Sequence, residues 1–113
     1  MARQFGGLGG IEGGRRLDED DAFEMAVNRA LGDRIRDDMG LACDMWSALA
    51  NVEWFHKDGD RAGYSFRAAG DLVAAIFGQD TDYMTFYCSG PYATVSTEIA
   101  EALEKEGWTY EIL

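Results

Sequence analysis

Apolar residues recur at helical spacing from Leu17 onwards, which predicts a helix that begins at the acidic run after this residue. The apolar positions, three or four residues apart, are Phe23, Ala26, Val27, Ala30 and Leu31. Such spacing gives one apolar stripe along an amphipathic helix. Asp18 is expected to cap the helix, and the acids after it suit the positive end of the helix dipole. Gly32 is expected to end it.

A second helix is predicted over about residues 33–50. Its apolar residues fall within roughly one 120° sector at 100° per residue: Ile35, Met39, Ala42, Cys43, Trp46, Leu49 and Ala50. Asp33, Asp37 and Asp44 fall in a narrow wedge on the opposite side. We therefore expect Trp46 to be buried between this helix and a sheet, and the three carboxylates to be stacked on the solvent side.

After residue 51 the spacing of apolar residues changes from the helical period of about 3.6 residues to a period of two residues. Residues 52–56 alternate as in a strand, and Asp58-Gly59 predicts a hairpin turn. The return strand is expected at 64–66. The small residues that follow, over 67–77, predict a short helix packed closely on the sheet and stopped by Gly78.

The last third of the chain predicts two more strands and one more helix. Residues 83–88 alternate, with Met84, Phe86 and Cys88 on one face and Tyr83, Thr85 and Tyr87 on the other. Pro91 requires a turn after this third strand. A helix is expected to begin at a cap, Thr94 or Ser96, and to end at Gly107, before a last strand over 108–112.

These elements predict an α+β fold in which two N-terminal helices precede a ββαβαβ order. The sheet is expected to be mixed and four-stranded, covered by helices that connect strands through right-handed crossovers. Six glycines in the first fourteen residues predict a flexible tail over 1–16. Residues 17–113 are expected to form a single domain, since a chain of 113 residues can bury a core without metals or staples.

The net charge is strongly acidic and disfavours non-specific binding of nucleic acid or anionic membranes through charge. Twenty-one acids against ten Lys and Arg give a net charge of −11. Spread evenly, the surplus on 17–113 amounts to about one charge per 480 Å² of a compact surface. Duplex DNA carries about one per 110 Å². Mimicry of DNA therefore requires that the acids be concentrated on one face.

The predicted partner-binding residues are the acidic clusters of the helices. They are Asp18, Glu19, Asp20, Asp21, Asp33, Asp37, Asp44, Glu98, Glu101 and Glu104. Their partner is expected to be a basic protein surface, such as that of a nucleic-acid-binding complex, with no direct contact to nucleic acid or membrane. The alternative is a solvated acidic surface that only keeps the protein soluble.

No catalytic, metal or cofactor site is expected from the motifs. His56 is the only histidine, and no nucleophile motif accompanies it. The pairs Asp58/Asp60 and Asp80/Asp82 lack the length and closing Glu of a calcium loop and are expected to serve as turn residues.

Cys43 and Cys88 are expected to be reduced thiols in the core, because two distant cysteines without an export signal rarely form a bridge. This expectation places the protein in the cytoplasm. Because Cys43 lies on the apolar face of its predicted helix, it is also expected to be buried and inert to thiol reagents.

Size, charge and lack of catalytic residues together resemble the small inhibitors that phages and mobile elements encode, including anti-restriction and anti-CRISPR proteins. The resemblance covers no motif and assigns no residue. The main functional hypothesis is therefore an acidic protein-binding module of inhibitor type. One alternative is a small enzyme that uses His56 with a nearby Cys or carboxylate. Another is an adaptor that assembles through exposed aromatics: Trp54, Tyr64, Tyr83, Tyr87 and Tyr92.

Overall fold

A computed structural model describes residues 17–88 and 95–112, with side chains from 21 to 88 and from 95 to 111. The elements are α1 (Leu17–Asp37), α2 (Met39–Asn51), β1 (Val52–Lys57), β2 (Asp60–Ala62), α3 (Phe66–Phe77), α4 (Thr81–Tyr87), α5 (Thr97–Lys105) and β3 (Thr109–Ile112). The predicted tail over 1–16, the turn at Pro91 and the side chain of Tyr92 lie outside the described residues.

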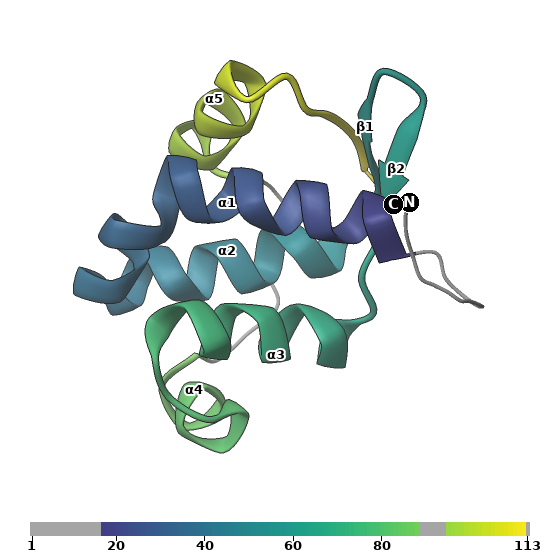
Figure 1. Cartoon of the computed structure of the whole chain (residues 1–113). Coiled ribbons are helices and arrows are strands. Elements are labelled where there is room, and N and C mark those ends of the chain that lie inside the picture. The colour runs from purple at the N-terminus through teal and green to yellow at the C-terminus, as the bar shows by residue number, and fades with distance from the viewer. Residues whose placement is uncertain (1–16, 89–94, 113) are drawn as a thin grey trace.

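The first three helices pack against one another, and the sheet lies at one end of this helical layer (Figure 1). α5 packs on α1, and α4 lies beside the C-terminal end of α3, away from the sheet (Figure 1). The three strands are antiparallel in the order β2-β1-β3. The α+β class is therefore confirmed.

The sheet differs from the prediction in size and direction. The described residues form three strands in place of four, and β3 runs antiparallel to β1, with Thr109 opposite His56. Because the sheet has no parallel pair, the expected right-handed crossovers do not occur. α3 was expected to cover a sheet. It packs on the helices α1 and α2 instead.

The hairpin turn is confirmed, but its return strand lies earlier than expected. Asp58 and Gly59 both have positive φ, 52° and 90°, as a two-residue turn of the I′ type requires. Such a tight turn starts the return strand at once, so that Asp60 pairs with Lys57. Ser65, predicted within the strand, instead caps α3 by accepting a hydrogen bond from the amide of Ala68 at 3.1 Å.

The boundary between the first two helices lies at Asp38, and the predicted stop at Gly32 is wrong. α1 continues through Gly32 because the apolar stripe continues to Ile35, which is fully buried. Glycine inside a helix costs about 1 kcal/mol, and burial of an Ile side chain returns about 1.5–3 kcal/mol. Asp38 is extended and accepts a hydrogen bond from the amide of Leu41, which starts α2. At its other end α1 already begins at Leu17, so Asp18 lies inside the helix and does not cap it.

The predicted third strand over 83–88 is the helix α4. Gly78 ends α3, and only Gln79 separates it from Asp80, whose carboxylate accepts a hydrogen bond from the amide of Tyr83 at 2.8 Å. This cap commits the segment to a helix immediately, and its alternating residues have no neighbouring strand. Strand preference depends on such context more than helix preference does.

Aromatic rings occupy the core both beside the sheet and between α2 and α3. Phe23 on α1 lies 4.4 Å from the ring of Phe55 and 5.0 Å from that of Trp108, which joins α1 to the sheet. Trp46 is 5% exposed, as predicted, but it lies against α3 and not against the sheet. Its indole N–H donates to the carbonyl of Phe66 at 2.9 Å.

Cys43 and Cys88 form a disulfide between α2 and the residue after α4. The prediction of reduced thiols is therefore wrong. In the disulfide form Cys43 has no free thiol that could react with a thiol reagent. The cysteines are only partly buried, because α4 lies at the edge of the core. Within the described ranges no helix has the length and apolar character needed to cross a membrane.

Candidate protein-binding surface

On the side formed by α1 and α5, acidic side chains are paired with arginines. Glu106 accepts from Arg29, whose Nη2 lies 2.8 Å from its Oε1. Arg34 pairs with Glu98 across the two helices, and Arg36 pairs with Asp33 within α1. Of the predicted partner-binding residues, Asp33 and Glu98 therefore already have a cation beside them.

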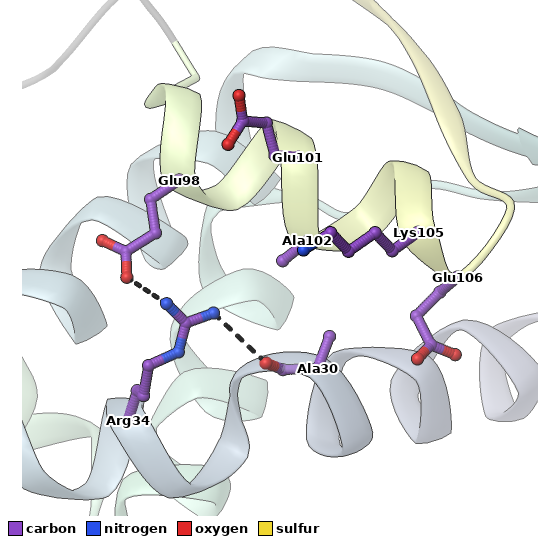
Figure 2. Close-up of a pocket in the computed structure, with 7 residues that line it drawn as sticks. All are labelled: Ala30, Arg34, Glu98, Glu101, Ala102, Lys105 and Glu106. Carbon is purple, nitrogen blue, oxygen red and sulfur yellow. Dashed lines mark hydrogen bonds and ion pairs between the residues drawn. The ribbon is translucent and has the colours of Figure 1, made fainter.

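A groove of about 410 Å³ runs between these two helices (Figure 2). Figure 2 shows Glu98 reaching to Arg34, which also donates to the carbonyl of Ala30 at 3.3 Å, while Glu101 points away from this pair. Two cations and three carboxylates line the groove, and it contains no hydroxyl, thiol or imidazole: Ala30, Arg34, Glu98, Glu101, Ala102, Lys105 and Glu106. The groove is thus an ion-paired interface between two helices.

The predicted acidic wedge of residues 33, 37 and 44 is divided between two helices. Asp33 and Asp37 belong to α1, and Asp44 belongs to α2 after the break at Asp38. All three are exposed. The wedge was predicted on one continuous helix, whereas the structure divides its residues between two helices.

Three of the other predicted acids lie at the surface. Asp21, Glu101 and Glu104 are exposed and form no ion pair among the described residues. Asp18, Glu19 and Asp20 lie in the first turn of α1, and their side chains are outside the described set.

The helices α2, α3 and α4 with their caps carry five carboxylates and one basic residue, a balance that the sequence analysis missed. The carboxylates are Asp38, Asp44, Asp71, Asp80 and Asp82, and none forms an ion pair in the described part of the chain. Arg67, in the first turn of α3, is the only basic residue on these three helices. The available signal was the absence of Lys and Arg between Arg36 and Lys57, and again between Arg67 and Lys105.

Three aromatic side chains are exposed on α4. Tyr83 is 37% exposed, Phe86 80% and Tyr87 52%. The Tyr83 ring also stacks at 6.3 Å on that of half-buried Phe77 at the end of α3. We call these four residues the α4 ridge. The sequence analysis had named Tyr83 and Tyr87 as exposed aromatics but had missed Phe86.

Trp54 and Tyr64, also named for an adaptor surface, have partners within the protein. Trp54 is partly buried beneath the guanidinium of Arg61, 4.0 Å from the ring centre. The hydroxyl of Tyr64 donates to Glu24 at 3.1 Å, and its ring packs against the core. Neither contributes to an open aromatic surface.

His56 lies on the central strand and its partner is a carboxylate. Its Nε2 is 2.5 Å from Oε2 of Glu111 on β3, without the alignment of a hydrogen bond. The cysteines are bonded to each other, so neither supplies a thiolate to this imidazole. In the part of the chain that the structure describes, no three His, Cys, Asp or Glu side chains are grouped closely enough to hold a metal ion.

Comparison with protein-family models, with curated proteins and with solved structures finds no significant match to this chain.

Proposed function

We propose that this protein is a small acidic binding module that covers a basic surface of a protein partner, as an inhibitor of a nucleic-acid-handling complex would. An anti-CRISPR or anti-restriction inhibitor encoded by a phage or mobile element is the type of protein that this proposal describes. Complementary charge gives such a module fast association and selection against acidic competitors.

The distribution of ion pairs supports this proposal. On α1 and α5, three arginines pair with carboxylates of the protein itself, while Asp37, Glu101 and Glu104 have no ion pair in the described part. On α2, α3 and α4, five carboxylates face solvent with no such partner among the described residues. A basic partner that approaches α2, α3 and α4 therefore meets carboxylates without displacing an arginine of the protein itself.

The proposal locates the protein in the cytoplasm, where glutathione and thioredoxin keep most thiols reduced. The bond between Cys43 and Cys88 would be open there for much of the time. Binding in the cytoplasm must therefore persist when this bond is reduced. A binding activity that disappears with reductant would instead indicate an oxidising compartment.

Two charge-reversal variants test the surface. The first, Asp44→Lys with Asp82→Lys, changes the α2–α4 side. The second, Glu101→Lys with Glu104→Lys, makes the same change of net charge on α5. All four side chains are exposed and without an ion pair in the described part, so each variant is expected to fold.

The readout is capture of partners from lysate at low and at high salt by the wild type and both variants. We expect one specific partner to be lost with the first variant and with high salt, and to be retained by the second variant. Loss with the second variant alone would move the contact to the predicted α5 acids. A partner retained by both variants, or bound equally at all salt concentrations, would contradict the acidic module.

The enzyme alternative is tested by His56→Ala. We expect this variant to capture the same partner as the wild type, because the imidazole is directed at Glu111. Loss of biological activity with unchanged folding and unchanged partner capture would favour the enzyme.

A further inference from the structure

α4 contributes little to the core, although several contacts hold it in place. Of its seven residues only Met84 is buried. Helices this short are not stable alone in water. Asp80 caps the first turn and Thr81 donates to Asp71 at 2.6 Å, and both contacts are independent of the redox state. In the oxidised protein the disulfide also fixes the residue that follows the helix. These contacts present the outer residues of α4 in a defined orientation.

The outer residues form a continuous aromatic surface. The rings of Tyr83 and Tyr87 are 4.9 Å apart, and those of Phe86 and Tyr87 are 5.0 Å apart. Other large exposed apolar side chains of the described residues, Met25 and Phe66, occur singly on α1 and α3. Single exposed apolar residues are common, whereas a cluster marks an interaction site.

Negative charge near the α4 ridge favours a positively charged partner there. Asp80 and Asp82 are exposed on or beside α4, and Asp71 is exposed on α3. Arg67 lies ten residues before the end of α3, which is about 15 Å along the helix axis. Carboxylates beside aromatic rings attract a cation, and a guanidinium also stacks on the ring face.

We propose that the α4 ridge is the docking site for a segment of the partner protein that carries arginine side chains among apolar ones. The guanidinium groups would stack on Tyr83, Phe86 and Tyr87 and pair with the adjacent aspartates. This inference rests on the proposed function and specifies its contact. A second copy of the chain is disfavoured as the occupant, because it would bring the same aspartates and a net charge of −11 to the interface.

The test uses the full chain and two synthetic peptides. One alternates arginine with leucine, and the other has lysine in place of every arginine, so that charge and apolar content are the same. Binding is measured by fluorescence anisotropy at low salt. The ridge variant is Phe86→Ser with Tyr87→Ser, and Phe66→Ser is the control for an exposed ring outside the ridge. Circular dichroism verifies that each variant is folded.

We expect the arginine peptide to bind the wild type several-fold more tightly than the lysine peptide, because a planar guanidinium stacks on the ring faces and an ammonium does not. The ridge variant should lose this preference, and Phe66→Ser should keep it. If the second substitution disturbs the fold, Phe86→Ser alone should lose part of the preference.

Three other outcomes would overturn the inference in distinguishable ways. Equal binding of both peptides by the wild type and the ridge variant, with loss in Asp44→Lys/Asp82→Lys, would refute the ridge contact and leave the acidic module standing. No binding of either peptide at low salt would contradict both proposals. Self-association of the wild type that the ridge variant abolishes would identify a second copy as the occupant and refute the arginine segment.

Discussion

Phe23 on α1 and Phe86 on α4 each contact another aromatic ring at short distance, 4.4 Å to Phe55 and 5.0 Å to Tyr87. Phe23 is fully buried, and Phe86 is 80% exposed. The first cluster joins α1 to the sheet, whereas Phe86 and Tyr87 lie on the exposed surface of α4. Ring contacts alone therefore do not tell which aromatics stabilise the fold, since burial decides that.

The largest effect is expected at the buried cluster. Phe23→Ala should lower the free energy of unfolding by about 3–5 kcal/mol, because it leaves a cavity between Phe55 and Trp108. Urea unfolding followed by tryptophan fluorescence measures this change. A loss below about 1 kcal/mol would show that the sheet is attached to α1 by other contacts.

The disulfide should contribute the next largest effect. Cys43→Ser with Cys88→Ser should lower the free energy of unfolding by about 2–4 kcal/mol, because the bond closes a loop with a sequence separation of 45 residues. The wild type in reductant should have the same stability as this variant, which is the control. If the oxidised and reduced wild types unfold at the same denaturant concentration, the bond does not form in solution.

A smaller effect is expected where α2 and α3 approach closely. A Cβ added at Gly70 would lie 2.5 Å from Cζ2 of Trp46, whose ring is held by its hydrogen bond to Phe66. Gly70→Ala should therefore destabilise the protein by about 1–3 kcal/mol, although alanine favours a helix.

Gly32→Ala is the matched control within α1. Its added Cβ would meet the movable side chain of Asn28 at 3.2 Å, so the helix preference should make this variant neutral or more stable by up to about 1 kcal/mol. Equal effects of both substitutions in thermal unfolding would contradict the close contact at Gly70.

These contrasts explain which parts of the structure the sequence could predict. Local signals were sufficient at the Asp58-Gly59 turn, because neighbouring residues determine it. At the start of α5 they left two candidate caps, Thr94 and Ser96, and Ser96 accepts the hydrogen bond from the amide of Ile99. α4 was predicted as a strand because Met84, Phe86 and Cys88 alternate with polar residues and tyrosines. That alternation does not reflect a buried and an exposed face of a sheet, since Phe86 is exposed while Met84 is buried.

The candidate surface was predictable only in part for the same reason. Net charge and the acidic helices follow directly from the sequence, but which carboxylates meet an arginine depends on packing. Arg34 and Glu98 are 64 residues apart in the chain and meet because α5 packs on α1. The disulfide is likewise a tertiary result, since it depends on α4 lying beside α2.

The smallest effect on stability is expected at the α4 ridge, and it completes the comparison with Phe23. Phe86→Ala should change the free energy of unfolding by no more than about 0.5 kcal/mol, because the side chain is mostly in water in the folded protein as in the unfolded one. Chemical unfolding of this variant beside Phe23→Ala measures both clusters in one experiment. A loss at Phe86 comparable with that at Phe23 would mean that the ring is covered in solution, by residues 89–94 or by a second copy, and the ridge would not be open to a partner.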